Sequence, residues 1–464
     1  MYQYEGLNDT IVAISTPSGQ GGIGIIRLSG KEALGIAAKM FRSCSSKQFS
    51  AFKSYTTHYG WVVSQDEKTV DEVLLTVMRS PKSYTKEDVV EISCHGGIVS
   101  LRAILNLAHD YGARLAHPGE FTKRAFLNGR IDLTQAEAVL DIIQSKTDTF
   151  LRISTNQLRG ELSSELTYIR ERLMNVYIEM EAIVNFPEDE IDSKGRDRLK
   201  KDIESAKEKV IQLLSSADQG RLLKEGIKIV LCGKPNVGKS SLLNVFLKTE
   251  RAIVSNIAGT TRDTIEETTH INGFPFLFVD TAGILDPRDV IEEEAVRRSH
   301  LHIQGADLVL LLVDGSQPLD EADHNLIRQF KEQNLILILN KSDLPQKTTK
   351  QDLINVAPGK IIQSISALKL TDIDQLKKSI VDNVLQGKQV SSQNLLVSNM
   401  RHIAALKDCR QSLNKAQEYL SDGLSLEFVS EEIKVGVNYL DGITGRNIDY
   451  DLLDNIFSQF CIGK

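Results

Sequence analysis

The residues with the strongest chemical signature form one segment, Gly233-Lys-Pro-Asn-Val-Gly-Lys-Ser240. It lies between an apolar run over 227–232, typical of a buried strand, and a periodic apolar run over 242–247, typical of a helix. A glycine-rich turn at such a corner directs backbone N–H groups into one concavity at a helix N-terminus, which favours phosphate. Lys239 can reach the terminal phosphates, and the Ser240 hydroxyl can bind Mg²⁺. The segment therefore predicts a nucleoside triphosphate site.

Two later motifs contain residue types that recognise guanine. Asn340-Lys-Ser-Asp343 follows the apolar run 335–339, and Asp343 can accept hydrogen bonds from guanine N1–H and the 2-amino group, which adenine cannot offer. Ser366-Ala-Leu368 follows the run 361–365 and can offer a backbone N–H to guanine O6. Together these motifs predict selection of GTP over ATP.

A fourth motif, Asp280-Thr-Ala-Gly283, follows the apolar run 276–278. Its carboxylate can hold Mg²⁺ through water, and the Gly283 N–H can contact a γ-phosphate and move when that phosphate leaves. Thr261, in the loop 254–263, is the candidate for a second hydroxyl on Mg²⁺ and for a switch that closes over the γ-phosphate. Four motifs in this order, each after its own strand, predict a GTPase.

The residue after the fourth motif departs from the Ras-like pattern. Ras-like proteins have a glutamine there that orients the attacking water, whereas this chain has Ile284. An apolar side chain cannot orient water, so another group must do it. The residues alone identify neither that group nor an arginine finger.

Length and composition limit the class of protein. A chain of 464 residues with 41% hydrophobic and 25% charged residues is typical of a globular protein with two or three domains. The longest apolar run covers only 308–313, and no charged-then-apolar leader is evident, so we expect a cytoplasmic protein without membrane contact. Five scattered cysteines indicate neither disulfides nor a zinc site. The net charge of −7 means that any RNA contact must be local.

Residues 1–130 alternate between strand-like and helix-like runs, which predicts a small α+β domain. The glycines between 19 and 24 match the dinucleotide fingerprint GxGxxG, but the following segment, 25–28, is strand-like. A dinucleotide site needs a helix N-terminus at that point, so we favour a glycine-rich hairpin over a dinucleotide-dependent oxidoreductase. Cys94, next to His95, is more typical of a structural thiol than of a catalytic pair.

Helical periodicity dominates the segments on both sides of the nucleotide motifs. Residues 131–225 predict the first part of an all-α helical domain, 226–386 an α/β GTPase domain with a parallel sheet, and 387–464 the second part of the helical domain. The apolar stripes of these helices are typical of bundle core. We therefore expect a GTPase domain inserted into a helical domain.

These motifs, together with Gly259-Thr-Thr-Arg-Asp263 and the final Cys461-Ile-Gly-Lys464, resemble the MnmE (TrmE) family of bacterial tRNA-modification GTPases over essentially the whole chain. The family that the chain resembles belongs to the TrmE-Era-EngA-YihA-Septin-like class of GTPases. It implies three domains: an α+β N-terminal domain that binds folate and dimerises, an all-α helical domain, and an inserted Ras-like P-loop GTPase domain.

For the GTPase site, the resemblance implies that K⁺ replaces an arginine finger, bound by Asn236, Ser255, Ile257 and Thr260. A desolvated cation beside the β- and γ-phosphate oxygens would offset charge that develops in the transition state. Spacing maps the family's water-orienting glutamate to Glu292, next to Glu293 and Glu294. Lys239 and Glu292 are thus the catalytic candidates for hydrolysis, and Ser240 and Thr261 are the Mg²⁺ ligands. The expected GTP contacts are Asn236, Val237, Gly238, Lys239, Ser240, Ser241, Ser255, Asn256, Ile257, Ala258, Gly259, Thr260, Thr261, Asp280, Thr281, Ala282, Gly283, Asn340, Lys341, Asp343, Ser366 and Ala367.

The resemblance also implies a 5-formyl- or 5,10-methylene-tetrahydrofolate in the N-terminal domain, bound by Arg27, Glu91 and Arg130 with Lys464 brought close. An arginine can bind a folate carboxylate in a fork, and a glutamate can accept from the pterin N–H and amino groups. Composition alone would make these residues surface ion pairs and the tail an inert, disordered end. The resemblance instead implies that Cys461 acts as nucleophile or acid/base near the uridine.

The expected function is GTP-driven modification of C5 of the wobble uridine in certain tRNAs, with a carboxymethylaminomethyl or aminomethyl group as product. The resemblance implies a homodimer, a heterotetramer with the flavoprotein MnmG, and K⁺-dependent hydrolysis that drives a conformational change. The rival interpretation is an Era- or Der-type GTP switch that binds RNA or ribosomal particles without covalent chemistry. Such switches have an RNA-binding module after the GTPase, whereas here helices and a cysteine-containing tail follow it.

Overall fold

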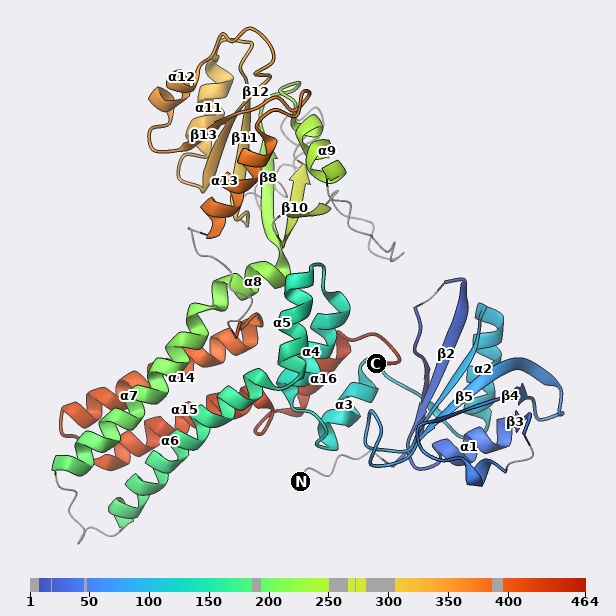
Figure 1. The fold of residues 1–464 in the computed structure, drawn as a ribbon. Helices are drawn as coiled ribbons and strands as arrows, with labels where there is room; N and C mark the ends of the chain where they lie inside the picture. Colours follow the sequence, from blue (N-terminus) through green and yellow to red (C-terminus); the bar gives the residue numbers. More distant parts are fainter. Residues whose placement is uncertain are drawn as a thin grey trace, which may run out of the picture. The chain divides into compact units, whose positions relative to one another are not determined.

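The computed structural model describes residues 8–17, 19–45, 48–185, 193–249, 266–271, 273–280, 305–385 and 395–464 (Figure 1). The chain divides into two compact units. Unit 1 contains Met1–Leu140, Asn156–Ile203 and Ser412–Lys464, and unit 2 contains Asp141–Thr155 and Glu204–Gln411. Each unit contains its own β-sheet. In the part of the chain that the structure describes, no helix is long and apolar enough to cross a membrane.

Unit 1 begins with a seven-stranded sheet in the order β3-β4-β5-β6-β2-β1-β7. Neighbouring strands are antiparallel except for the parallel pair β1 and β7. The strands are β1 (Ile11–Ile14), β2 (Gly21–Ser29), β3 (Phe41–Ser43), β4 (Thr56–Val63), β5 (Thr69–Met78), β6 (Val89–Gly96) and β7 (Arg114–Leu115). β1 and β2 pair as a hairpin, and the residues after the glycines continue a strand. The hairpin prediction is confirmed, and the dinucleotide alternative loses the helix it requires.

Two helices, α1 (Ala33–Met40) and α2 (Ile98–Asp110), cover one face of this sheet. α2 buries Leu101, Ile104, Leu107 and Ala108, which recur every three or four residues and so share one side of the helix. A short 3₁₀ turn, η1 (Phe49–Ala51), packs at the edge of the same core. A third helix of this domain, α3 (Glu120–Leu127), follows β7 and buries Phe121 and Ala125.

The helical part contains α4 (Leu133–Gln144), α5 (Asp148–Leu158), α6 (Glu161–Asn185), α7 (Ser193–Ser215), α8 (Ala217–Glu225), α14 (Met400–Ser421), α15 (Leu426–Thr444) and α16 (Tyr450–Ser458). Within unit 1, α6 packs along α15, and Arg170 of α6 pairs with Asp441 of α15. The sequence pattern predicts one helix over 196–223, but the helix breaks at Ser216. The Ser216 hydroxyl donates to Leu213 O at 2.7 Å and accepts from the Val397 N–H, so it competes with the helical backbone bonds.

Unit 2 contains a six-stranded sheet in the order β13-β12-β11-β8-β10-β9. Its strands are β8 (Ile227–Cys232), β9 (Glu266–Ile271), β10 (Phe274–Asp280), β11 (Leu308–Asp314), β12 (Leu335–Asn340) and β13 (Ile361–Ser364). Five strands are parallel, but β9 is antiparallel to β10. The expectation of a parallel sheet is therefore corrected to a mixed one, because a tight turn around Gly273 joins β9 and β10 as a hairpin.

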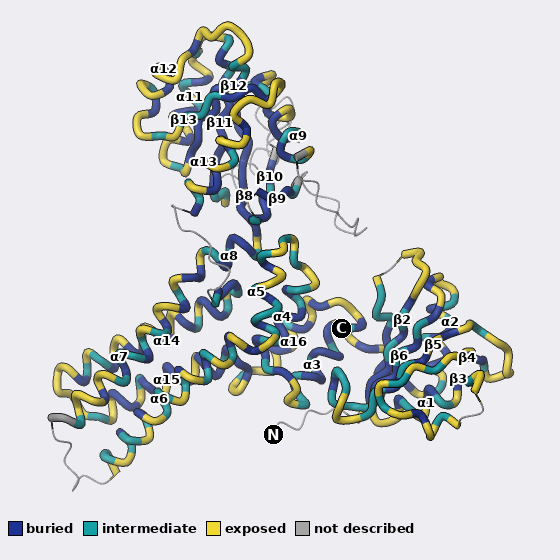
Figure 2. The backbone as a smooth tube through the Cα atoms, in the orientation of Figure 1, coloured by how far each residue is buried: buried dark blue, intermediate teal, exposed yellow. Residues whose placement is uncertain are grey.

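Helices cover both faces of this sheet, as the continuously apolar inner strands require. α9 (Lys239–Thr249) and α13 (Ile373–Leu385) pack on one face, and α11 (Glu321–Gln329) and α12 (Lys350–Val356) pack on the other. The inner strands are buried over nearly their whole length (Figure 2). The register places Asp280 beside Leu231, and Asp314 beside Asn340. The four nucleotide motifs thus follow strands that end at one edge of the sheet.

Candidate functional site

The phosphate-binding loop of unit 2 connects β8 to α9 through unusual backbone conformations. Gly233 and Gly238 have φ angles of 141° and 102°, and Asn236 has a φ of 64°. At Gly238 an added Cβ would lie only 2.3 Å from the side-chain nitrogen of Asn340, so a side chain would displace that amide. The loop ends where α9 begins at Lys239, so the helix N-terminus and its N–H groups face the loop.

The ammonium group of Lys239 lies over this loop. Its Nζ donates to the carbonyl oxygens of Gly233 and Lys234, both at 2.8 Å, and the residue is only 9% exposed. Ser240, in the first turn of α9, is exposed. A cation held by backbone carbonyls beside an exposed hydroxyl matches the expected arrangement for a triphosphate and Mg²⁺.

Asn340 joins the phosphate loop to the guanine-recognition motifs. Its Nδ2 donates to Val237 O at 2.8 Å, and its Oδ1 accepts from the Ala367 N–H at 3.1 Å. The residue is 2% exposed, so these contacts satisfy a buried amide. Asn340, predicted as a GTP contact, therefore lies at the centre of the site and positions the two loops that it contacts.

The guanine-recognition residues are also connected to each other. The Ser366 hydroxyl donates to Asp343 Oδ1 at 2.5 Å, which orients an otherwise exposed carboxylate. Lys341 has a φ of 65°, and its Nζ lies 2.6 Å from Asp314 Oδ2. Burial raises the pKa of Asp314, but the hydrogen bonds from Lys341 and Ser316 outweigh that effect and hold its pKa below the usual value. Asp314 was not predicted as a site residue, and no motif spacing points to it.

Several predicted residues lie outside the described part of the chain. They are Ser255, Asn256, Ile257, Ala258, Gly259, Thr260, Thr261, Thr281, Ala282, Gly283 and Glu292. The backbone of Asp280 is described as the last residue of β10, but its side chain is not. The remaining predicted GTP contacts lie after the ends of β8, β12 and β13, and Asn340 contacts the loops that follow β8 and β13.

A second polar site lies in unit 1, where Arg27 of β2 is directly opposite Glu91 of β6. Arg27 Nε and Nη2 approach Glu91 Oε1 at 2.8 and 2.7 Å. The third nitrogen, Nη1, donates to Gly463 O at 3.0 Å, and the Ser15 hydroxyl donates to the same oxygen at 3.1 Å. Cross-strand pairing and the end of the chain therefore converge on one guanidinium group.

Tyr84 lies between the two predicted arginines. The guanidinium carbon of Arg130 lies 4.7 Å from the Tyr84 ring centroid, and that of Arg27 lies 5.5 Å from it. Arg27 is also 5.6 Å from the Phe121 ring of α3. Sequence reasoning missed Tyr84 and Ser15, because neither belongs to a motif with defined spacing. An aromatic ring between cations would have been the available signal, but only the fold brings them together.

The C-terminal residues Gly463 and Lys464 lie against the Arg27–Glu91 pair. Gly463 has a φ of 92°, and an added Cβ there would lie 2.4 Å from Ile14 O. Burial lowers the pKa of Lys464, as does the positive charge of Arg27, and these effects exceed the opposite influence of Cys461 and Glu91. Arg27, Glu91, Arg130 and Lys464 are thus brought together, with Cys461 exposed beside them.

Cys94 lies on the neighbouring part of the sheet and has a different environment. Its Sγ donates to Gly24 O at 3.4 Å within the core. Burial, with help from the charge of Asp71, raises the Cys94 pKa to about 11. The thiol therefore stays protonated, which fits the structural interpretation rather than a catalytic pair with His95.

A phosphate loop, a guanine-recognition motif and a doubly covered mixed sheet, on a chain with a separate α+β domain and long helices, define a multidomain P-loop GTPase. Two family models match the chain: "GTP-binding protein TrmE N-terminus" over residues 10–130 and "MnmE helical domain" over residues 133–461. The chain therefore belongs to the MnmE family of tRNA modification GTPases.

Curated relatives agree with this assignment over the whole chain. The tRNA modification GTPase MnmE of Lactiplantibacillus plantarum is 44% identical over 459 residues, which cover 98% of each chain. The proteins of the same name from Enterococcus faecalis and Geobacter sulfurreducens are 43% and 44% identical. Those two alignments cover 98% of both chains, and 99% of this chain and 100% of the relative, respectively.

Proposed function

We propose that this GTPase, acting with the flavoprotein MnmG, adds a carboxymethylaminomethyl or aminomethyl group to C5 of the wobble uridine of certain tRNAs. The one-carbon unit would come from 5-formyl- or 5,10-methylene-tetrahydrofolate. The observation that carries this proposal is the hydrogen bond from Arg27 to Gly463 O, which brings the Cys461 tail to the Arg27–Glu91 pair. A tail with a purely passive role would not need to be seated on a charged cross-strand pair.

GTP binding is supported by the contacts around the phosphate loop. The exposed Ser240 hydroxyl suits Mg²⁺, and Asp343 is oriented by Ser366 for hydrogen bonds with guanine. Asn236, the described member of the proposed K⁺ ligands, is exposed at the turn of the loop, which fits a cation beside the phosphates. Bound K⁺ would supply positive charge to the β- and γ-phosphate oxygens. Glu292 is proposed to orient the attacking water.

Folate binding is supported by the residue types at the unit 1 site. Glu91 has a carboxylate that can accept from pterin donors, and Arg27, Arg130 and Lys464 provide cations for folate carboxylates. Burial and the positive charge of Arg27 lower the Lys464 pKa, and a bound folate carboxylate would offset that positive charge. The folate would supply a transferable one-carbon unit, while Arg27 and Glu91 would orient it and Cys461 would act as nucleophile or acid/base.

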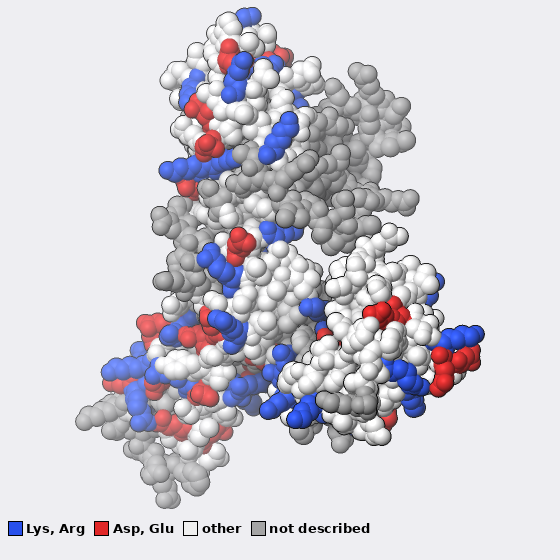
Figure 3. Space-filling view, turned by 45° about the vertical axis from the view of Figure 1, so that its right-hand side comes forward, with Lys and Arg blue, Asp and Glu red and all other residues white. Residues whose placement is uncertain are grey.

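The proposed organisation places folate binding and dimerisation in residues 1–130, GTP binding in 226–386, and the helical domain in 131–225 and 387–464. Positive and negative side chains are interspersed over the helical elements visible in Figure 3. Because the net charge is −7, we propose that this cytoplasmic protein contacts tRNA only at a local surface and through the partner MnmG.

The proposal is tested by replacing Cys461 with Ser and Arg27 with Ala, and measuring tRNA nucleosides by mass spectrometry in reactions containing MnmG. We expect each variant to lose about 10²-fold or more of modification activity, since acid–base catalysis alone contributes ~10²–10⁴-fold. GTP turnover by the variants should stay at the wild-type rate. Full modification by the Cys461→Ser variant would contradict the proposed role of Cys461, and no modification by the wild type in the presence of MnmG would favour the switch-only alternative.

Potassium dependence has its own test. GTP turnover is measured in KCl and in NaCl at equal ionic strength, with the Asn236→Ala variant in parallel. We expect turnover to fall in NaCl for the wild type, and to be low in both salts for the variant. Equal wild-type rates in the two salts would contradict the proposed K⁺ site.

A further inference from the structure

We propose that α3 is the support that places Cys461 at the Arg27–Glu91 pair, and that Gly119 and Lys123 are positioning residues for this thiol. The inference rests on the proposed role of Cys461. It is carried by three sets of contacts: a buried ion cluster that anchors α3, a close backbone approach at Gly119, and an ion pair from Lys123 to α16.

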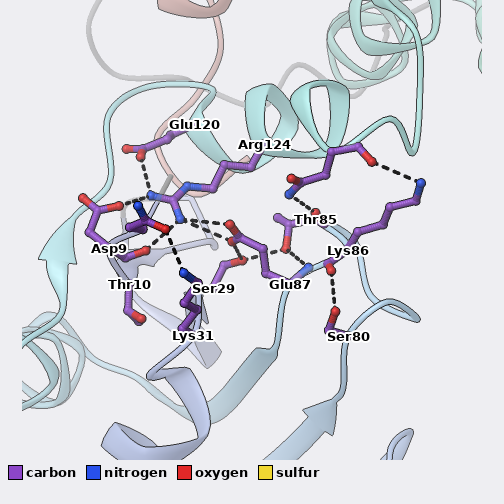
Figure 4. Close-up of polar contacts among 12 residues, drawn as sticks. Asp9, Thr10, Ser29, Lys31, Ser80, Thr85, Lys86, Glu87, Glu120 and Arg124 are labelled. Atoms are coloured by element: carbon purple, nitrogen blue, oxygen red, sulfur yellow. Dashed lines mark hydrogen bonds and ion pairs between the residues drawn. The ribbon is translucent and has the colours of Figure 1, made fainter. Parts of the chain in front are cut away.

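The anchor is the side chain of Arg124, which is only 1% exposed. It pairs with Asp9 at 2.5 Å, with Glu120 at 3.0 Å and with Glu87 at 3.2 Å (Figure 4). Arg114 pairs with Asp9 and Glu120, both at 2.6 Å. Two cations thus meet three carboxylates from separate segments, with Arg124 buried at the centre and Arg114 and Asp9 partly exposed at the rim. The cluster holds the first turn of α3 against the edge of the sheet.

The other end of α3 is held by a second set of hydrogen bonds. Asn128 Nδ2 donates to Thr85 O at 2.7 Å, and Lys86 Nζ donates to the carbonyls of Asn128 and Gly129 at 3.1 and 2.9 Å. The Tyr84 hydroxyl lies 2.9 Å from the hydroxyl of Thr122 in the first turn of the helix. α3 is therefore attached along its whole length to the loop that carries Tyr84.

α3 presents its N-terminus to the tail through Gly119. This residue has a φ of 69°, and its N–H donates to Cys461 O at 3.4 Å. An added Cβ would lie 2.5 Å from Phe457 O and 3.0 Å from the Cβ of Phe460. Contacts this short involve backbone of α16, so a side chain at this position must push α16 away. Gly119 thus permits the close approach that brings Cys461 to the site.

Lys123 forms the next contact, one turn further along α3. Its Nζ pairs with Asp454 of α16, one turn before Phe457. On the sheet side of α3, Phe121 lies under the Arg27 guanidinium. The same helix therefore contacts Arg27 on one side and the Cys461 segment on the other. A shift of α16 relative to α3 would move the thiol relative to Arg27 by a similar distance.

The first experiment compares Gly119→Ala with Gly112→Ala. Both glycines have positive φ, 69° and 106°, so both substitutions carry backbone strain, but an added Cβ at Gly112 meets nothing within 4 Å. The full chain is assayed with MnmG for tRNA modification, and separately for GTP turnover. Cys461 alkylation by iodoacetamide is followed by mass spectrometry, with exposed Cys44 as the internal reference.

We expect Gly119→Ala to reduce modification by about 10²-fold, because displacement of a reacting group by ~1 Å costs on that order. Its Cys461 alkylation rate should change several-fold relative to Cys44, because the already exposed thiol moves away from Arg27 and Lys464, while GTP turnover stays unchanged. Gly112→Ala should match the wild type in all three assays. Wild-type modification, or an unchanged Cys461 alkylation rate, in Gly119→Ala would overturn the inference.

The second experiment reverses the ion pair. Lys123→Asp and Asp454→Lys should each lower modification and change Cys461 alkylation in the same direction as Gly119→Ala. The double variant should recover most of both values. If Lys123 and Asp454 had a purely structural role, the single variants would lose thermal stability and GTP turnover in parallel with modification. Failure of the double variant to recover either readout would count against Lys123 as a positioning residue. If Cys461→Ser proves fully active, the proposed role of Cys461 fails, but the alkylation assay on the wild-type thiol still reports whether α3 places the tail.

Discussion

The two candidate sites are built in opposite ways. The nucleotide site in unit 2 consists of short motifs that follow neighbouring strands of one sheet, and much of its geometry lies in the backbone of Gly233 and Gly238. The site in unit 1 joins Arg27, Glu91 and Gly463, which are far apart in sequence and meet through side-chain contacts. A local site carries its geometry in residues that are consecutive, whereas an assembled site depends on every segment that reaches it.

This difference predicts different responses to substitution. In the nucleotide site, residues that shape the backbone should matter most. In the unit 1 site, residues that hold segments together should matter as much as those expected to touch ligand. Substitutions of backbone-shaping residues in unit 2 and of segment-joining residues in unit 1 test this contrast.

Gly238→Ala should abolish most GTP binding. The substitution combines positive-φ strain with a Cβ placed 2.3 Å from Asn340 Nδ2, so we expect about a 10²-fold loss of affinity from ~1–3 kcal/mol of strain plus a displaced amide. Fluorescent GTP titration measures the loss. Gly359→Ala is the matched control, because Gly359 has a φ of 82° but open space around it. Similar affinities for the two variants would break the contrast.

Asn340→Ala should weaken GTP binding by roughly 10–100-fold, since it removes the partners of the Val237 carbonyl and the Ala367 N–H at a cost of ~1–3 kcal/mol. Isothermal titration with GTP measures this change. Folate binding to the same variant should be unaffected. A change confined to guanine selectivity would show that Asn340 does not support the phosphate loop.

Arg27→Lys should lower folate affinity about 10-fold although it keeps the charge, because a lysine cannot bond Glu91 and Gly463 O simultaneously through a planar fork. Equilibrium binding of 5-formyl-tetrahydrofolate provides the readout, and GTP turnover serves as the control. If lysine replaced arginine without loss, the site would depend on charge rather than on its assembled geometry.

The pH dependence should be the smallest effect. The Asp314 pKa lies below its usual value near 3.8 because hydrogen bonds from Lys341 and Ser316 outweigh burial. The charged carboxylate therefore contributes stability above that usual value, and the contribution is lost as pH falls through the lower folded-state pKa. Thermal unfolding of Lys341→Met and the wild type should differ at pH 6 and converge toward pH 3. A constant difference across this range would contradict the ion-pair contribution.

The helical and strand patterns show where prediction from sequence fails. The strand β9 was not predicted, because its pairing with β10 depends on the hairpin turn rather than on a motif. The break at Ser216 was missed, since its cause is a hydrogen bond from Val397, which lies far along the chain. Local pattern predicts an element's type, but distant partners decide where it ends.

The sequence by itself determined the GTPase class and the order of its motifs, because consecutive residues encode a loop and a helix start. The residues expected at the unit 1 site came only from the family resemblance. Only the tertiary structure decided that Asn340 joins two loops, that Tyr84 lies between two arginines and that Gly119 admits the tail. These roles depend on distances between segments remote in sequence, and no local pattern records such distances.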